Sequence, residues 1–373
     1  MSEKKKAYIF DVYDDYEIRL RYVRDVFEEK GYQVTLYLSD FDHFHKEKYK
    51  TRRPDVEYID VLPYSRNFSF RRIRSHMKFA DSCLEIQKKD PADLVYVMVP
   101  PNSMASQFGK YHQKNHSCRL IFDLCDMWPE SFPVKGMKPL LAAPFSIWAG
   151  LRNRYMKYAD LIMSECDLFA DMIRKYVPDD IVRTFWLCRR QIVKEVLPVD
   201  SDSLTFAYVG SLNHVVDVDA IVKTLAAIRK HVPLKFHIIG DGESRQRLLE
   251  MLDAEQIDYD YHGLVFDEEE KRKIFAKCHY GFNMMRDTAC IGLTMKSLDY
   301  FAYDIPILNN VPADTWKMVA DNNLGFNIST EADIEKILSV KEEDYQKMRH
   351  NVLAFHAEHL SEEQFKAKLA SYL

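Results

Sequence analysis

The feature that most constrains the fold is an alternation of strands and helices that runs through the chain twice. Short apolar runs rich in β-branched and aromatic residues alternate with longer segments of helical periodicity. In the first half we expect strands at 7–12, 33–38, 56–62, 94–99, 120–124 and 161–164, and helices at 16–30, 70–88 and 103–114. Apolar strands joined by helices predict a doubly wound parallel sheet that is buried on both faces.

The alternation restarts near residue 204. We expect strands at 204–209, 234–239, 259–262, 280–284 and 305–308, and helices at 219–230, 244–255, 268–278 and 295–302. No strand is followed by the G-x-G-x-x-G of dehydrogenases, which argues against that class. Because 373 residues are many for one core, we expect two Rossmann-like α/β domains, 1–195 and 196–345, and a helical tail over 346–373.

Composition and charge indicate the class of protein and its cellular compartment. The net charge of −5 argues against nucleic acid as a partner. The seven cysteines are odd in number and contain no C-x-x-C pair, so we expect neither a disulfide framework nor a zinc site. The first residues lack the apolar region of a signal peptide, and no apolar run reaches the ~18–20 residues of a membrane span. We therefore expect a cytoplasmic protein with reduced thiols.

The segment 290–310 has the composition of a loop, a short helix and a buried strand. Thr294 suits the N-cap of a helix from Met295 to Ala302, with Lys296 in its first turn and Asp299 one turn further on the same face. Free backbone N–H groups and a lysine at a helix start bind anions, and a carboxylate one turn deeper can accept hydrogen bonds from ribose. The segment therefore predicts a site for the diphosphate and ribose of a nucleotide; the alternatives are a solvated Lys296 and an ion-paired Asp299.

This segment resembles the donor-binding signature of GT-B glycosyltransferases, especially the large retaining family four. Asp299 matches the second of that family's two glutamates, the first falls at Ile291, and Asp304 replaces the usual glycine before the strand. The resemblance implies an α/β GT-B fold: two Rossmann-like domains face a cleft, and a C-terminal helix crosses back to the first domain. It also implies a nucleotide-diphosphate sugar as donor substrate, with no cofactor.

The resemblance also selects loops that follow the other strands of the second domain. Gly210-Ser211 stands where the family has Gly-Arg, so an arginine and a nearby lysine are missing and Lys296 and Arg286 must contact the phosphates. The remaining donor-binding candidates are Gly240, Asp241 and Gly242 in a Gly-x-Gly turn, and Leu264 and Val265 in a loop for the base. The alternative for each glycine pair is an ordinary turn between a strand and a helix.

The first domain is expected to hold the acceptor. The stretch 122–132, FDLCDMWPESF, resembles the Asp-x-Trp-Pro-Glu segment of some bacterial polysaccharide transferases. Asp126 and Glu130 are therefore candidate catalytic residues, as bases or as contacts to acceptor hydroxyls; the alternative is a structural loop. Ser164-Glu165 matches the family's serine near the cleft. No Asp-x-Asp motif indicates a metal-dependent transferase, since Asp217 and Asp219 suit helix capping, and we expect metal-independent transfer.

The segment 135–157 has an apolar centre with basic residues on both sides. This composition is typical of a helix at a membrane interface, and a buried helix is the alternative. Together these observations predict a hexosyltransferase-type enzyme acting on a glycan or lipid-linked glycan in surface polysaccharide or glycoconjugate synthesis, at the inner face of the membrane. The alternatives are a non-catalytic sugar-nucleotide-binding subunit and a nucleotide-sugar epimerase.

Overall fold

The computed structural model describes all residues except 1–3, 15, 133–137, 197–198, 200–202 and 289. Contacts divide the chain into two compact units. Unit 1 consists of Met1–Trp186 and Phe365–Leu373, and unit 2 consists of Leu187–Gln364. Each unit is built around its own parallel sheet.

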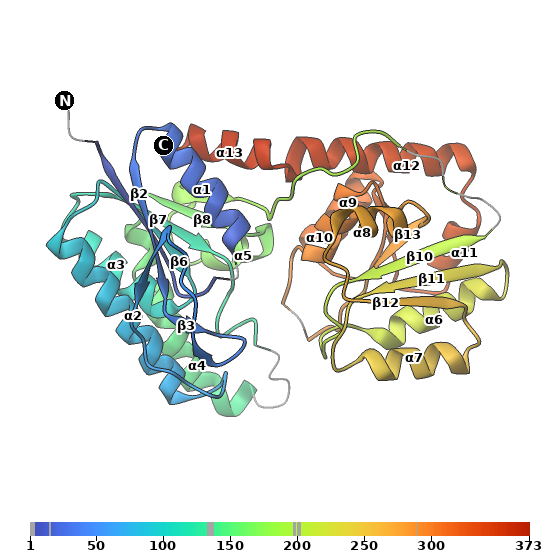
Figure 1. The fold of residues 1–373 in the computed structure, drawn as a ribbon, viewed down its shortest axis with the longest axis horizontal. Helices are drawn as coiled ribbons and strands as arrows, with labels where there is room; N and C mark the ends of the chain where they lie inside the picture. Colours follow the sequence, from blue (N-terminus) through green and yellow to red (C-terminus); the bar gives the residue numbers. More distant parts are fainter. Residues whose placement is uncertain (1–3, 15, 133–137, 197–198, 200–202, 289) are drawn as a thin grey trace. The chain divides into compact units, whose positions relative to one another are not determined.

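Unit 1 contains a seven-stranded sheet in the order β5-β2-β1-β6-β7-β8-β9 (Figure 1). Its strands are β1 (Lys6–Asp11), β2 (Gln33–Ser39), β5 (Val56–Ile59), β6 (Leu94–Val99), β7 (Arg119–Leu124), β8 (Leu161–Ser164) and β9 (Val182–Thr184), and a hairpin pairs β3 (Phe41–Asp42) with β4 (Glu47–Lys48). Its helices are α1 (Glu17–Glu29), α2 (Phe70–Lys89), α3 (Asn102–His112), α4 (Lys138–Asn153) and α5 (Asp167–Ile173). The central strand β6 is buried along its whole length, as expected for a sheet covered on both faces.

Unit 2 contains a six-stranded parallel sheet in the order β12-β11-β10-β13-β14-β15 (Figure 1). Its strands are β10 (Leu204–Val209), β11 (Leu234–Ile239), β12 (Tyr259–Gly263), β13 (Tyr280–Asn283), β14 (Ile307–Asn309) and β15 (Gly325–Asn327). Its helices are α6 (Val218–Arg229), α7 (Arg245–Ala254), α8 (Glu268–Phe275), α9 (Met295–Ala302), α10 (Asp314–Asn322), α11 (Ala332–Leu338) and α12 (Glu342–Phe355). Apolar side chains of α6 and α7 pack on one sheet face around Phe206, Phe236 and Ile238.

The end of the chain returns to unit 1. Helix α13 (Glu362–Ser371) places Phe365 against Tyr22 and Phe185, and Lys366 forms an ion pair with Asp25 at 2.6 Å. The predicted fold class, with two doubly wound sheets and a tail that contacts the N-terminal region, is confirmed. The predicted domain limits at 195 and 345 stay a prediction.

Sequence patterns located the long elements and missed the short ones. Helix α9 begins and ends at the predicted residues, whereas β9, α5, α10 and β15 were not predicted. β9 and β15 have only three residues each, which is too short for a periodic signal. Strand β14 begins at Ile307 rather than at 305, because the N–H of Ile305 donates to Tyr300 O and Pro306 has no N–H. No helix in the described parts of the chain combines the length and apolar character that a membrane span requires.

Candidate functional site

The N-terminus of α9 is fixed by a ladder of buried polar side chains across three strands. Thr294 caps the helix by accepting from Ser297 N at 3.1 Å, and its Oγ1 donates to Asn283 Oδ1 at 2.8 Å. Asn283 in turn donates to Asn309 Oδ1, and Asn309 donates to Asn327 Oδ1, at 2.8 and 2.7 Å. The predicted N-cap is confirmed, and the ladder orients the free N–H groups of the first helical turn. Sequence reasoning missed Asn309 and Asn327, whose pairing depends on the order of the strands.

The loops after β10 and β11 contact each other directly. Gly210 N donates to Ile239 O at 2.9 Å, and Leu212 N donates to Asp241 O at 2.9 Å. Gly240 has φ +144°, and a Cβ there would lie 1.9 Å from Gly210 O, so only glycine allows this approach. The structure therefore brings together the predicted Gly210-Ser211 and Gly240–Gly242 turns. Ser211 and Gly242 are exposed, so both turns have surface open to a ligand.

Lys296 lies over the first of these turns. A Cβ at Gly210 would be 3.6 Å from Lys296 Cγ, and Lys296 Nζ is 5.5 Å from the centre of the Tyr208 ring and 3.7 Å from Met285 Sδ. Burial lowers the pKa of Lys296 to about 8, and the Asp299 carboxylate opposes this shift. Within the described residues Lys296 makes no ion pair, so its ammonium is a cation whose charge an anionic ligand could balance.

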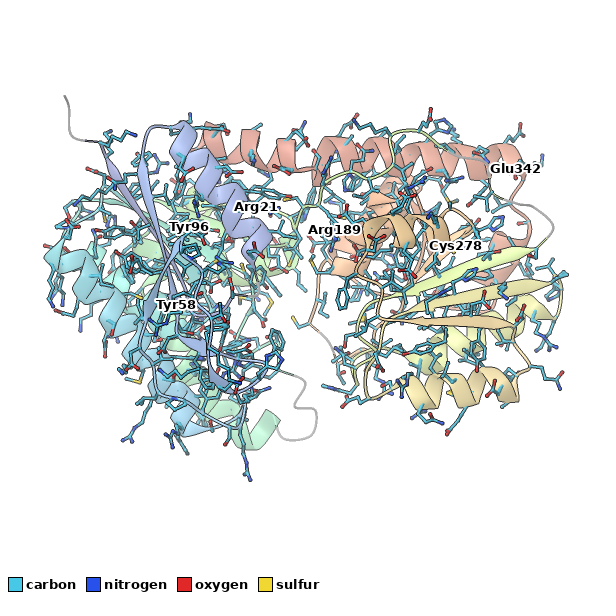
Figure 2. The ribbon with its side chains drawn as sticks, viewed as in Figure 1. Arg21, Tyr58, Tyr96, Arg189, Cys278 and Glu342 are labelled. Carbon is cyan, nitrogen blue, oxygen red and sulfur yellow. The ribbon has the colours of Figure 1, made fainter. Side chains whose placement is uncertain are left out.

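Asp299 lies beside Arg189, with Arg189 Nη1 3.0 Å from Asp299 Oδ1; Figure 2 labels Arg189. The contact is an ion pair by distance, but Asp299 Oδ1 receives no hydrogen bond of acceptable geometry from the described residues. Burial raises the pKa of Asp299, and the charges of Arg189, Lys271 and Lys296 oppose that rise. The predicted alternative of an ion-paired Asp299 is thus realised, while one buried oxygen still lacks a hydrogen-bond donor.

The loop after β12 continues the same edge of the sheet. Gly240 N donates to Gly263 O at 2.7 Å, which places the predicted base-binding loop next to the Gly240 turn. Leu264 is 61% exposed and Val265 is buried, so the two residues point to different surroundings. Of the predicted pair, Leu264 is open to a ligand and Val265 anchors the loop.

A hollow of about 470 Å³ lies near the carboxyl ends of β13 and β14. Arg286 and Ile291 both line it, and Arg286 Nη2 is 3.9 Å from Asp219 Oδ2. An apolar Ile291 can offer no hydrogen bond to sugar hydroxyls there. Asp217 also lines the hollow, and its side chain caps α6 by accepting from Ala220 N at 3.0 Å, as predicted.

In unit 1, Asp126 is held by its own loop. Its Oδ1 accepts from Met127 N at 2.7 Å, and its Oδ2 accepts from Trp128 Nε1 at 2.6 Å. Burial raises the pKa of Asp126, although hydrogen bonds from Ser131, Met127 and Trp128 counteract the rise. These contacts match the predicted alternative of a structural loop, because each carboxylate oxygen already accepts a hydrogen bond.

Glu130 is paired with a fully buried arginine. Arg152 Nη2 donates to Glu130 Oε1 at 2.6 Å, Arg152 Nη1 lies 3.2 Å from Oε2, and the same Nη1 donates to Trp128 O. Such a bidentate pair occupies both oxygens that a general base would use. Glu130 nevertheless lines a hollow of about 990 Å³ between α3 and α4, together with Gln107, Phe145 and Tyr155.

Glu165 is a buried carboxyl with a strongly raised pKa. Sequence reasoning named it only as the neighbour of Ser164. Burial raises its pKa to about 8, with Arg19 opposing the rise, and Tyr16 Oη donates to Glu165 Oε2 at 3.2 Å. Ser164 is fully buried and donates to Cys166 O, so it faces the protein interior. Burial depends on the fold, and the local sequence gave no signal of it.

Comparisons with known proteins identify similar folds and a family model that matches part of the chain. Residues 203–339 match the family model described as glycosyl transferases group 1. The fold is similar to the lipopolysaccharide outer core galactosyltransferase WaaB in its apo form, with 14% identity, a TM-score of 0.69, and 99% of this chain and 98% of that chain covered. It is also similar to HepE of Anabaena solved with UDP and glucose, with 12% identity, a TM-score of 0.66 and 98% of each chain covered.

A third similar structure, TarM of S. aureus in complex with UDP and glycan-type ligands, has 11% identity and a TM-score of 0.58 over 79% of this chain and 58% of that chain. A comparison with curated protein sequences gives no match. The class defined by two parallel-sheet units with a returning helix is the GT-B fold. The match to the family model of glycosyl transferases group 1 lies within unit 2, and the similarity to the solved structures extends over the GT-B fold of both units.

Proposed function

We propose that the chain transfers a sugar from a nucleotide-diphosphate donor to a hydroxyl of a glycan, in surface polysaccharide or glycoconjugate synthesis. The observation that carries the proposal is the half-buried Lys296 beside Gly210, at the capped N-terminus of α9. The lysine, the helix N-terminus and the exposed turns at Ser211 and Gly242 are suited to a diphosphate. The buried Asp299 oxygen without a donor is suited to a ribose hydroxyl.

The proposed reaction breaks the bond between the anomeric carbon and the diphosphate oxygen, and it forms a bond between that carbon and the acceptor oxygen. Negative charge develops on the leaving diphosphate, where Lys296 and the α9 N–H groups would stabilise it without a metal. We infer that the acceptor proton passes to the leaving phosphate, since the oxygens of Asp126 and Glu130 are engaged in hydrogen bonds. Retention of configuration at the anomeric carbon is the outcome expected of that route.

The acceptor is proposed to bind in unit 1, at the hollow lined by Glu130, Phe145 and Tyr155. Helix α4 next to it buries Ala149 and Arg152 but leaves Ile147 73% exposed and Leu151 39% exposed. Arg154 and Lys157, which follow, are exposed as well. Apolar side chains beside basic ones suit an anionic membrane surface, which supports a lipid-linked glycan as acceptor at the inner face of the membrane. Residues 133–137 of the predicted interfacial segment lie outside the described residues.

The membrane contact is tested with vesicles of anionic and of zwitterionic lipid. The wild type is expected to sediment with anionic vesicles and to be released by salt, because the attraction is electrostatic. Ile147→Glu with Leu151→Glu should abolish sedimentation while leaving the melting temperature unchanged, since both side chains are exposed. Equal sedimentation of the double variant would contradict the contact.

A second candidate function is a sugar-nucleotide-binding subunit without transferase activity. It is favoured by Ile291, which lines the 470 Å³ hollow where the family resemblance places a glutamate. This candidate keeps nucleotide binding and predicts no turnover of the donor.

One assay separates the two candidates. UDP-, GDP- and ADP-sugars are incubated with the protein and a lipid-linked glycan fraction, and nucleoside diphosphate release and glycan mass are followed. Turnover of one donor, lost in Lys296→Ala and kept in the exposed control Lys317→Ala, would support transfer. Binding of a nucleotide sugar without its turnover under any condition would support the non-catalytic subunit. Conversion of the sugar without acceptor would instead indicate an epimerase.

A further inference from the structure

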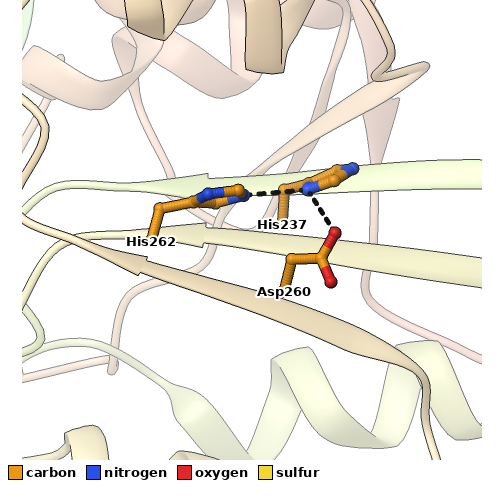
Figure 3. Close-up of side chains that lie close together, drawn as sticks. All are labelled: His237, Asp260 and His262. Atoms are coloured by element: carbon orange, nitrogen blue, oxygen red, sulfur yellow. Dashed lines mark hydrogen bonds and ion pairs between the residues drawn. The ribbon is translucent and has the colours of Figure 1, made fainter.

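Two histidines and an aspartate meet on neighbouring strands of unit 2, outside the proposed donor site. His237 lies on β11, and Asp260 and His262 lie on β12, with all three ligand atoms within 4.8 Å of one another (Figure 3). His237 and Asp260 are directly opposite in the strand register. The predicted absence of a zinc site rested on cysteine spacing, which carries no information about histidines brought together by strand pairing.

The distances in this cluster suit a tetrahedral ion. His237 Nδ1 lies 3.0 Å from His262 Nε2 and 3.5 Å from Asp260 Oδ2. Ligands at the 2.0–2.2 Å typical of zinc are about 3.3 Å apart at a tetrahedral centre. These two spacings bracket that value, and all three ligand atoms lie within 4.8 Å of one another, so side-chain movements can bring them around one ion in place of the proton between the imidazoles.

One hydrogen bond can join the two histidines, but it leaves His237 Nδ1 and Asp260 Oδ2, 3.5 Å apart, without a good hydrogen bond between them. His237 Nδ1 carries either one hydrogen or one lone pair, yet it faces both His262 Nε2 and Asp260 Oδ2. As a donor it can serve only one of them well, and as an acceptor it cannot bond with the carboxylate. A metal ion would instead coordinate all three atoms at once.

The backbone directs His262 into the cluster. The pairing of β11 with β12 shifts between Ile238 and Ile239, because Tyr261 pairs with Ile238 and Gly263 pairs with Ile239. His262 is therefore the additional residue of a β-bulge on an edge strand. Bulges re-aim side chains and are often found beside functional sites.

We propose that His237, Asp260 and His262 form a binding site for one divalent transition-metal ion of the Zn²⁺ type. Two imidazoles and one carboxylate are the ligand set of an open zinc site, in which water takes the fourth position. Asp260 is 45% exposed, so the site is open to solvent. The ion would cross-link β11 to the edge strand β12, one residue before the loop that begins at Gly263. The site is independent of the proposed transferase reaction.

One neighbouring cation competes with the metal for the carboxylate. Lys235 Nζ lies 2.9 Å from Asp260 Oδ1, on the oxygen that does not face His237. Asp260 can thus keep Lys235 on one oxygen and bind the ion with the other. The lysine neutralises part of the carboxylate charge, which favours a borderline-soft ion held mainly by imidazole over Mg²⁺ or Ca²⁺, which require several oxygen ligands.

The test is equilibrium dialysis of the metal-free full-length protein against Zn²⁺, followed by metal analysis. Asp260→Asn and His262→Gln remove one ligand each, and Asp260→Asn changes an exposed side chain with little effect on packing. The control is His231→Gln, which removes an exposed histidine outside the cluster. Cooperative thermal unfolding of each variant shows that it is folded.

Wild type and His231→Gln are expected to bind one equivalent of Zn²⁺ more than either cluster variant. Zn²⁺ should also raise their melting temperatures, because it binds only the folded state. With Co²⁺ in place of Zn²⁺, they should show the visible absorption of a tetrahedral centre without thiolate charge-transfer bands. Equal Zn²⁺ stoichiometry in wild type and both cluster variants, or a thiolate spectrum that survives in them, would overturn the proposal. No binding by the wild type would overturn it as well.

Discussion

The candidate residues of the two units differ in what their charged groups already contact. In unit 1, Glu130 forms a bidentate pair with Arg152, and both oxygens of Asp126 accept hydrogen bonds from their own loop. In unit 2, Lys296 is half-buried and makes no ion pair among the described residues, and Asp299 Oδ1 lies 3.0 Å from Arg189 without a hydrogen bond of acceptable geometry. The candidate carboxylates of unit 1 are thus engaged within the protein, whereas Lys296 of unit 2 has no anionic partner among the described residues and is the residue that we propose to bind a ligand.

The partners of a charged group within the protein distinguish a binding residue from a structural one. A charged group that is fully satisfied within the protein contributes mainly to stability, and its loss leaves a partner unpaired. A buried charge without a partner costs stability and is retained where a ligand completes it. Substitutions in unit 1 should therefore lower stability, and substitutions at the proposed donor site of unit 2 should lower ligand binding or activity.

The largest effect is expected for Lys296→Ala. Removing a cation that stabilises the leaving diphosphate should lower kcat/KM by about 10²–10³-fold, the loss typical of one transition-state donor. The melting temperature should not fall, because the substitution removes a partly desolvated ammonium that has no ion pair among the described residues. The measurement pairs steady-state kinetics with thermal unfolding, and Lys317→Ala on α10 is the control. Full activity of Lys296→Ala would show that Lys296 does not take part in the reaction.

Glu130→Gln should lower the stability of the protein without lowering the rate of the catalysed step. It leaves the fully buried Arg152 without its carboxylate, so the free energy of unfolding of unit 1 should fall by about 3 kcal/mol. The KM for the acceptor can change, because Glu130 lines the proposed acceptor hollow, but kcat at saturating acceptor should stay close to that of the wild type. The control is Glu85→Gln, which removes an exposed pair with Lys88 and should leave the free energy of unfolding essentially unchanged. A large loss of kcat with unchanged denaturant stability would instead identify Glu130 as a base.

The affinity for nucleoside diphosphate should depend on pH through Lys296. Its pKa of about 8 in the free protein means that the ammonium is mostly protonated at pH 7 and mostly neutral at pH 9. The diphosphate is already fully ionised over this range, since the last phosphate pKa is about 6. Affinity should therefore fall by up to about tenfold from pH 7 to pH 9, with proton uptake on binding near pH 8.

Calorimetric titrations in buffers of different ionisation enthalpy measure that proton uptake. Lys296→Arg keeps its charge throughout and should flatten the profile. A wild-type profile as flat as that of Lys296→Arg would show that Lys296 does not contact the phosphates.

The smallest effects are expected for substitutions that remove one helix N-cap in each unit. Thr294→Ala and Ser69→Ala each remove an N-cap, and each should cost about 1 kcal/mol of stability. Thr294→Ala should also weaken nucleotide binding, because it releases the N-terminus of α9 from Asn283. Ser69→Ala should leave nucleotide binding unchanged. Equal binding by the two variants would show that α9 is not part of the donor site.

The sequence was sufficient for the fold and for the part of the site that is local in the chain. The bounds of α9, its cap and the glycine turns each depend on residues that are neighbours in the sequence. The structure has α9 and its Thr294 cap as predicted, and it brings the turns at Gly210 and Gly240 into contact. Whether those residues bind a nucleotide stays a prediction.

Contacts between distant segments could not be predicted in the same way. The pairing of Asp299 with Arg189 joins residues far apart in the sequence, and so does the Asn283–Asn309–Asn327 ladder. Asp304 combines a local and a distant feature: the family resemblance places it where a glycine is usual, and its φ of +64° agrees with that position. Its ion pair with Arg349 of α12, at 2.7 Å, required the fold.

The most direct measurement is calorimetric titration of UDP, GDP and ADP into wild type, Lys296→Ala and Glu130→Gln. The contrast between the units predicts that one of these ligands binds one per chain, that Lys296→Ala weakens its binding at least about tenfold, and that Glu130→Gln leaves it unchanged. Binding that Lys296→Ala does not alter, or no binding of any of the three at millimolar concentration, would contradict the assignment of the donor site to the N-terminus of α9.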